Sequence, residues 1–245
     1  MKASSMFRTV LFLALMGVAG IASYGQRPTG NANATEAPLP KDIHPETRSR
    51  MPLPKREEFD DYGKKVYDEL INSSPATERL HSPKLAKPLA DARHYLKYET
   101  DLGDRLIAIA VLATSRELDN EFEWTQWEEH SKMAGDPKLF ATKTQVEPQI
   151  IDIIKYCKPV TGLGEKEATI IKLGREMFGT KKVSSATFAD TMRLFGKRGT
   201  VDLVETMALY GATGAEILAF DVQLLKGQKP LLPARSSIPA CSQKR

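Results

Sequence analysis

The segment that most constrains the fold is "DRLIAIAVLATSREL", residues 104–118. Its centre, Leu106 to Ala113, is apolar at every position, so a helix formed here has no polar face. A helix that is apolar on all sides must be covered on all sides. The sequence therefore predicts a buried central helix surrounded by other elements.

The rest of the region carries helical periodicity and no convincing strand alternation. In "REEFDDYGKKVYDELIN", residues 56–72, apolar side chains recur at steps of three and four, which is typical of an amphipathic helix. Further helices are predicted at about 83–99, 121–135, 145–157, 165–178, 185–195 and 201–224. About eight helices with short connections predict one all-α domain spanning residues 56–226.

The N-terminal 25 residues have the layout of a secretory signal peptide. "MKASSMFRTVLFLALMGVAGIASYGQ" has a basic start, an apolar run from Val10 to Ala22 and small residues near Gly25. The alternative is a membrane anchor, but the run is shorter than the ~20 apolar residues that span a bilayer. We expect export to a periplasm or the extracellular space, with membrane contact only through this segment.

Both flanks of the domain lack an apolar period. Residues 26–55 are rich in Pro, Asn, Thr and charge, which predicts a disordered linker or an arm lying on the domain surface. Residues 227–245 predict a flexible tail. The net charge of +4 is small for 245 residues, so no nucleic-acid partner is expected.

The chain has two cysteines, Cys157 and Cys241. In an oxidising compartment they could pair, although Cys241 lies close to the C-terminus. A CxxC pair is absent from the sequence. We do not expect a thiol mechanism that uses two cysteines so far apart in the chain.

The candidate site lies in "EFEWTQWEEH", residues 121–130. On a helix, residues three, four and seven apart share a face, so Glu123, Trp127 and His130 form one stripe. A carboxylate and an imidazole on a partly desolvated face can shift each other's pKa and exchange protons, as general acid–base catalysis requires. The structural alternative is a hydrogen-bonded core histidine with a solvated face of glutamates. No metal site is predicted, because HExxH and paired ExxH spacings are absent from the sequence.

Arg105 and Arg116 bracket the apolar helix and return to the same side of it. Two guanidinium groups facing one cleft could hold a dicarboxylate. The alternative is that each pairs with a carboxylate at its own end of the helix, from Asp101, Asp104 or Glu117.

Three segments in order resemble the carboxymuconolactone decarboxylase-like family, which also contains the alkylhydroperoxidases. They are "RLIAIAVLATSRELDNEFEWTQWEEHSKMAG", "GEKEATIIKLGREMF" and "VSSATFADTMRLFGKRGTVDLVETMALYGATGAEILAF". The resemblance covers roughly residues 60 to 225. It implies an all-α, alkylhydroperoxidase-like domain that forms a homo-oligomer.

The sequence departs from the pattern of the alkylhydroperoxidases, in which a glutamate, a CxxC pair and a histidine relay protons and electrons. Aligning "FEW" with the family's aromatic-Glu-Trp places these four positions on Ala108, Asn120, Glu123 and Trp127, none of which matches. A register that places His130 on the relay histidine breaks the "FEW" match. The resemblance therefore favours the decarboxylase branch, whose reaction requires anion binding and a proton donor rather than a thiol.

The leading hypothesis is a cofactor-independent lyase or decarboxylase acting on a small carboxylated compound, with His130 as proton donor or base and Glu123 orienting it. Two arginines would bind the carboxylate and two tryptophans would form cleft walls: Arg105, Arg116, Trp124 and Trp127. The alternatives are a thiol-dependent peroxidase and a non-catalytic oligomer that binds a small apolar or aromatic ligand between its tryptophans. Separation of Glu123 from His130, or sealing of both from any pocket, would favour the last.

Overall fold

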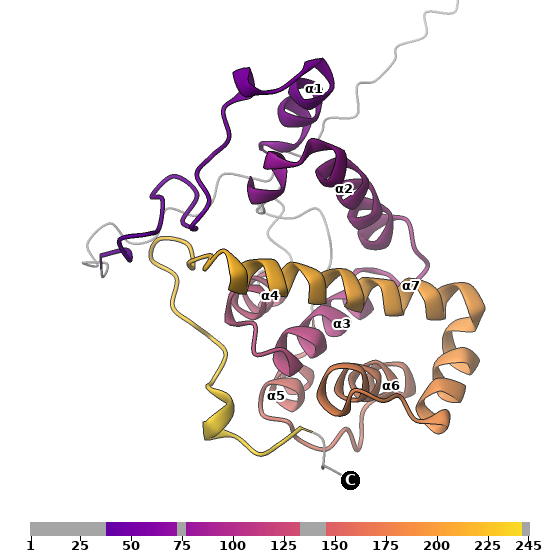
Figure 1. Ribbon diagram of the computed structural model, residues 1–245. Coiled ribbons are helices and arrows are strands. Elements are labelled where there is room, and N and C mark those ends of the chain that lie inside the picture. The colour runs from indigo at the N-terminus through magenta and orange to yellow at the C-terminus, as the bar shows by residue number, and fades with distance from the viewer. Residues whose placement is uncertain (1–37, 73–76, 133–145, 242–245) are drawn as a thin grey trace, which may run out of the picture.

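The computed structural model describes residues 38–72, 77–132 and 146–241, and this part of the chain is helical without a strand (Figure 1). The predicted all-α class is confirmed. The α-helices are α1 (Asp61–Leu70), α2 (Pro83–Tyr98), α3 (Asp104–Glu117), α4 (Glu121–Lys132), α5 (Pro148–Lys155), α6 (Glu165–Gly174) and α7 (Ser185–Ala219). Three 3-10 turns accompany them: Arg56–Glu58, Thr77–His81 and Arg235–Ser237.

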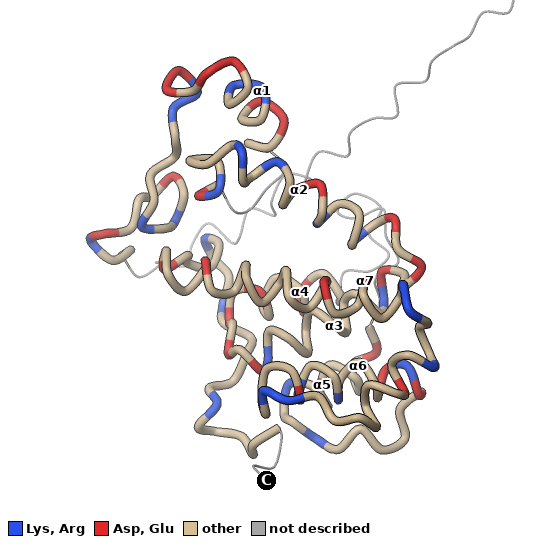
Figure 2. Tube along the Cα trace, turned by 45° about the vertical axis from the view of Figure 1, so that its right-hand side comes forward, with Lys and Arg blue, Asp and Glu red and all other residues tan. Residues whose placement is uncertain are grey.

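Helix α3 lies at the centre, as its composition predicts. All its residues from Ile107 to Arg116 are buried, and it contacts α4, α5, α6 and α7. In Figure 1, α7 crosses on one side of α3, while α5 and α6 lie on the other. In Figure 2 charges of both signs mark α1 and α2, whereas α3 is largely uncharged. Burying each large aliphatic side chain contributes about 1.5–3 kcal/mol, so the apolar run anchors the domain.

Two helices differ from the predicted boundaries. Helix α6 ends at Gly174 and continues into a π-helical turn, Arg175–Thr180, where the periodicity alone predicts one regular helix. The two helices predicted at 185–195 and 201–224 are the arms of α7, which bends at Gly196. Gly196 has φ 66° and ψ −177°, a conformation that is essentially restricted to glycine.

The described part of the N-terminal flank, residues 38–55, is an arm on the domain. The Arg50 amide donates to the Phe220 carbonyl at 2.8 Å, and the Gln223 amide donates to the Arg48 carbonyl at 2.8 Å. Ile43, within this arm, is buried. The hydrogen bonds tie the arm to the end of α7, and the arm leads into α1 and α2, which share a smaller core.

Residues 227–241 pack against the domain, which differs from the flexible tail expected for this region. In Figure 1 this segment descends beside the helices from the end of α7 toward α5. Leu232 is buried in the main core, and Cys241 forms a disulfide with Cys157. The Pro and Ser content of this segment predicts flexibility. Composition does not show that Leu232 packs in the core or that Cys241 forms a disulfide.

No helix within the described ranges is long and apolar enough to cross a membrane. The predicted signal peptide, residues 1–25, lies outside those ranges.

Candidate functional site

Helix α4 carries the candidate residues and begins at a side-chain cap. The Asn120 side-chain oxygen accepts a hydrogen bond from the Glu123 amide at 3.1 Å, which fixes the first turn. Trp124, one residue further on, has 0% exposure. Its Nε1 donates to Glu128 Oε2 at 2.6 Å, and the same oxygen lies 2.7 Å from Lys155 Nζ. Trp124 therefore belongs to the core and does not form a cleft wall, contrary to the sequence prediction.

Glu123 is a buried carboxyl group beneath α2. Burial raises its pKa, whereas Arg93, a hydrogen bond from Trp127 and then Arg79 and Lys97 act in the opposite direction. Desolvation is the largest of these effects, so the neutral acid is favoured relative to an exposed glutamate.

His130 lies two turns further along α4 and is half-buried. Desolvation, followed by the positive charges of Lys97 and Arg93, lowers its pKa to about 4. The imidazole is therefore neutral at pH 7 and can accept a proton. Its ring lies 6.2 Å from the Trp127 ring, edge to face.

Two basic residues of α2, Arg93 and Lys97, face this part of α4. The Arg93 guanidinium carbon lies 5.8 Å from the centre of the Tyr210 ring, and Lys97 Nζ lies 5.5 Å from that of Trp127. The Trp127 and Tyr210 rings are in turn 5.4 Å apart, edge to face. The site is thus an interface of α2, α4 and α7 in which aromatic rings support two cations.

The sequence reasoning missed Arg93 and Lys97. They stand four residues apart, so they share a face of α2. That spacing is the only signal in the sequence, and it does not tell which helix the face meets.

A small cavity adjoins Glu123, with a volume of about 20 Å³. This is room for one water molecule, since a cavity needs about 10–15 Å³ to hold one. Glu78 also lines it, and its Oε1 has no hydrogen-bond partner among the described residues. Arg79 spans the cavity edge, donating to Glu216 at 2.7 Å and to Thr213 at 2.8 Å. Glu123 is therefore in contact with a water-sized cavity rather than a substrate-sized one.

Arg105 and Arg116 do not face one cleft, contrary to the sequence prediction. Arg105 forms ion pairs with Glu147 at 2.7 Å and Glu167 at 2.6 Å. Arg116 is buried, pairs with Asp119 and donates to the Pro233 carbonyl at 2.9 Å. Angular position places both arginines on one side of α3, but eleven residues of helical rise separate them by roughly 16 Å.

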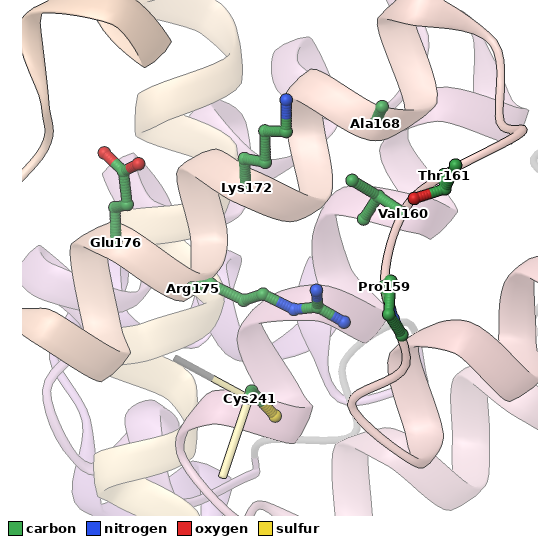
Figure 3. Close-up of a pocket in the computed structure, with 8 residues that line it drawn as sticks. All are labelled: Pro159, Val160, Thr161, Ala168, Lys172, Arg175, Glu176 and Cys241. Atoms are coloured by element: carbon green, nitrogen blue, oxygen red, sulfur yellow. The ribbon is translucent and has the colours of Figure 1, made fainter. Parts of the chain in front are cut away.

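A larger pocket lies elsewhere, beside α6 (Figure 3), with a volume of about 530 Å³. It is lined by Pro159, Val160, Thr161, Ala168, Lys172, Arg175, Glu176 and Cys241. A volume of this size lies within the range of small-molecule sites. The pocket combines residues of α6, the loop before it, the π-helical turn after it and the C-terminal segment, so no pattern along the sequence indicates it.

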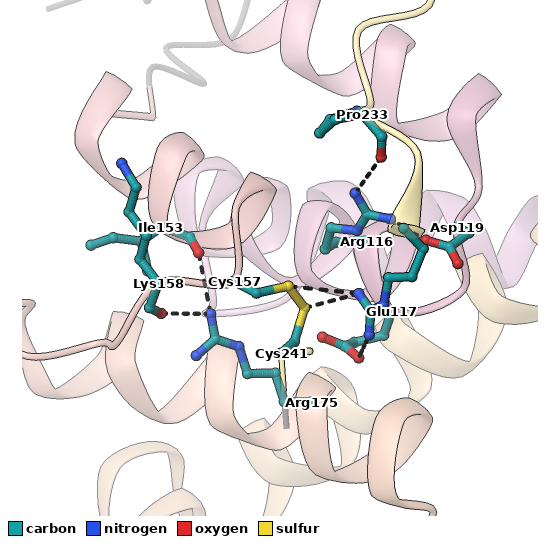
Figure 4. The surroundings of a disulfide bond; sticks show 10 residues. Arg116, Glu117, Asp119, Ile153, Cys157, Lys158, Arg175, Pro233 and Cys241 are labelled. Carbon is teal, nitrogen blue, oxygen red and sulfur yellow. Dashed lines mark hydrogen bonds and ion pairs between the residues drawn. A yellow bond between two sulfur atoms is a disulfide. The ribbon is translucent and has the colours of Figure 1, made fainter. Parts of the chain in front are cut away.

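The disulfide between Cys157 and Cys241 borders this pocket (Figure 4). The Arg235 guanidinium donates to Cys241 Sγ at 2.9 Å and to Cys157 Sγ at 3.6 Å. Arg235 also donates to the buried Glu117 carboxylate at 3.1 Å. Glu117 and the two cysteines have ligand atoms within 4.8 Å of one another, the only such group in the described ranges. Their sulfur atoms are bonded to each other and so are not thiolate ligands in this state.

No family model matches the chain, and no curated protein matches it. One solved structure is similar to it, described as the alkylhydroperoxidase AhpD core of an uncharacterized peroxidase-related protein from Ralstonia eutropha JMP134. The sequence identity is 14% and the TM-score 0.49, and the match covers 77% of this chain and 100% of that chain. The group of proteins named there is the one that the sequence segments resemble. At this level of similarity, neither membership of that family nor its activity follows.

Proposed function

We propose that the protein is a cofactor-independent lyase or decarboxylase that acts on a small carboxylated compound at the α2–α4–α7 interface. The observation that carries the proposal is that Arg93 and Lys97 act electrostatically on both Glu123 and His130. Burial raises the pKa of the carboxyl, against the effect of the two cations, whereas burial and the cations together lower the pKa of the imidazole to about 4. A pair of titratable groups displaced in opposite directions is the pattern found for acid and base partners in active sites.

The roles that follow differ from those in the sequence hypothesis. Glu123, whose neutral form is favoured, is the proton donor, and neutral His130 is the base. Arg93 and Lys97 take the place of Arg105 and Arg116 in binding the substrate carboxylate. When the bond to the carboxyl carbon breaks, carbon dioxide leaves and the electron pair stays on the substrate carbon, which then takes the proton of Glu123. His130 accepts a proton from water and passes it to the Glu123 carboxylate, which restores the acid.

Access to this site is from the side of α2. Arg93, Lys97 and His130 are half-buried, whereas Glu123 is fully covered. The substrate therefore meets the cations and the imidazole first. None of these three residues lines the water-sized cavity beside Glu123, so Glu123 acts on the substrate directly. Residues 133–145, which follow α4, lie outside the described residues.

The test is a screen of small carboxylated lactones and 3-oxo acids for release of carbon dioxide, followed by variants on any substrate found. Glu123→Gln and His130→Phe should each lower kcat by about 100-fold or more, because general acid–base catalysis contributes that much. His94→Gln is the matched control, since the His94 side chain is 65% exposed. Full activity in both site variants would overturn the proposal.

The two alternative functions, a ligand-binding module and a thiol peroxidase, require different residues. The absence of a substrate-sized pocket at Glu123 and His130 among the described residues favours the non-catalytic module. Its predicted binding mode, between the two tryptophans, is disfavoured because Trp124 is fully buried and bonded to Glu128. A thiol peroxidase would use Cys157 and Cys241 in their reduced form. Loss of peroxide consumption after both thiols of the reduced protein are alkylated would support the peroxidase.

A further inference from the structure

The pocket beside α6 has a cationic wall. Lys172 and Arg175 are three residues apart, and both line the pocket (Figure 3). One terminal nitrogen of Arg175 donates to the backbone carbonyls of Ile153 at 3.2 Å and Lys158 at 2.9 Å. No carboxylate of the described residues forms an ion pair with Lys172 or Arg175. The Glu117 carboxylate acts electrostatically on Arg175, but it is ion-paired with Arg235. The two positive charges of the wall therefore favour an anionic ligand.

The one carboxylate that lines the pocket is already engaged. Glu176 accepts hydrogen bonds from the Ser184 amide at 2.5 Å, the Ser184 hydroxyl at 3.2 Å and the Thr187 hydroxyl at 2.7 Å. These bonds hold it at the N-terminus of α7, where a negative charge is stabilised by the helix. Glu176 therefore leaves the cationic character of the pocket in place.

The same pocket reaches one sulfur atom of the disulfide. Cys241 lines the pocket, whereas Cys157 does not. Arg235 donates to both sulfur atoms, and a guanidinium beside a sulfur stabilises the thiolate that forms when the bond is cleaved. The Glu117 carboxylate lies within 4.8 Å of both sulfur atoms and opposes this effect, but it is paired with Arg235 at 3.1 Å. Arg235 therefore offsets the carboxylate and supports a thiolate at the place where a ligand can reach the bond.

We propose that this pocket binds a small anionic thiol, which reduces the Cys157–Cys241 disulfide by attack on Cys241. The thiolate sulfur forms a bond to Cys241 Sγ, the bond between the two cysteines breaks, and its electron pair leaves on Cys157 Sγ beside Arg235. A second thiolate then attacks the sulfur of the bound thiol and releases Cys241 as a thiolate. The small thiol is oxidised to its own disulfide, and the protein gains two thiols.

This site is independent of the proposed lyase function. The pocket is formed by α6 and its neighbours, whereas the acid–base residues lie between α2, α4 and α7. In Figure 1, α2 and α6 lie on opposite sides of α7. Failure of either proposal leaves the other unchanged.

The experiment compares three small thiols of different charge on the oxidised full-length protein: 3-mercaptopropionate, 2-mercaptoethanol and cysteamine. The rate of disulfide reduction is measured by mass-tagging the freed thiols. It is divided by the thiolate concentration at the chosen pH and by the rate constant of the same thiol with a small uncharged disulfide, because nucleophilicity rises with the pKa of the thiol. The anionic thiol should react faster than the neutral one by about 10-fold or more, which is the low end of electrostatic steering. The cationic thiol should be the slowest, and added salt should reduce the differences.

Lys172→Glu is the variant that tests the pocket, since Lys172 is exposed and its replacement leaves the core intact. It should abolish the preference for the anionic thiol. Lys197→Glu makes the same charge change at an exposed position of α7 outside the pocket and should keep the preference. Equal normalised rates for the three thiols, an unchanged preference in Lys172→Glu, or a disulfide that resists all three thiols in the folded protein would overturn the proposal.

Discussion

At the scale of single residues, His130 shows how neighbours from another helix decide a charge state. Burial on α4 and two cations of α2, Lys97 and Arg93, lower its pKa to about 4. The sequence predicts that Glu123, Trp127 and His130 share one face of α4. The sequence could not predict that Arg93 and Lys97 lie close to His130, because contacts between α2 and α4 depend on the tertiary arrangement.

The first prediction concerns the pH dependence of stability through His130. In the unfolded chain the imidazole takes up a proton near its ordinary pKa of about 6.5, but in the folded state only near pH 4. The unfolded state therefore binds more protons between these values, and stability falls as the pH drops from about 6.5 to 4. This group should account for a loss of roughly 2–3 kcal/mol, measured by urea unfolding.

His130→Phe should remove most of that loss, because phenylalanine keeps a ring beside Trp127 and cannot be protonated. His94→Gln, at an exposed site, should retain the wild-type dependence. An unchanged slope in His130→Phe would contradict the assignment of the pH dependence to this histidine.

The second prediction concerns Glu123, whose shift has the opposite sign. Burial raises its folded-state pKa, so its contribution is fully present below the ordinary value of about 4.5 and is lost as the pH rises through the folded-state pKa. Glu123→Gln cannot ionise. The stability of Glu123→Gln relative to wild type should therefore increase between pH 4.5 and 8 in chemical unfolding experiments. Glu205→Gln, at an exposed position of α7, is the control variant with the same chemical change.

At the scale of elements, α3 could be predicted most securely, since a helix without a polar face must be buried. The arginines at its ends could not be placed from the same reasoning. Periodicity gives the angle of a side chain around the helix, but a shared cleft also requires closeness along the axis. Arg105 and Arg116 fail this second requirement. Each pairs with a carboxylate of its own surroundings, Arg105 with Glu167, which is distant in the sequence, and Arg116 with Asp119 just beyond the helix.

The third prediction concerns the bend in α7 at Gly196. Its positive φ of 66° with an extended ψ is accessible to glycine and strained for any residue with a Cβ. Gly196→Ala should lower the free energy of unfolding by about 1–3 kcal/mol, measured by urea denaturation. Lys197→Ala, next to it, should change stability by less than about 0.5 kcal/mol, as is usual for surface sites. Wild-type stability in Gly196→Ala would show that α7 can run through this position without the bend.

At the scale of the whole molecule, the two ends of the domain are tied down by different means. Residues 38–55 are held by backbone hydrogen bonds to the end of α7, and residues 227–241 by Leu232 and a disulfide. The sequence shows that both segments lack an apolar period. It does not show which surface of the domain each segment contacts, so their packing could not be predicted. The expected homo-oligomer stays a prediction, which light scattering on the purified protein would check.

The fourth prediction concerns the disulfide as a tie on the C-terminal segment. The bond closes a loop with a sequence separation of 84 residues, which restricts the unfolded chain. A Cys157→Ser, Cys241→Ser double variant should lose about 2–4 kcal/mol of unfolding free energy. For a domain of this size, that loss corresponds to a Tm lower by about 4–16 °C. Circular dichroism melts with and without a phosphine reductant measure it, and the reductant should lower the Tm of the wild type only.

Limited trypsin digestion separates this tie from the packing of Leu232. Arg235 donates to both sulfur atoms of the disulfide and to Glu117, so its backbone is held in place while the bond is intact. In the double variant, cleavage after Arg235 should be several-fold faster, because local opening of a segment governs proteolysis when reclosing is fast. Cleavage after Lys226, which is exposed and precedes Leu232, should change less, since Leu232 keeps its place in the core. Equal acceleration at both sites would mean that the whole segment from 227 onward depends on the disulfide.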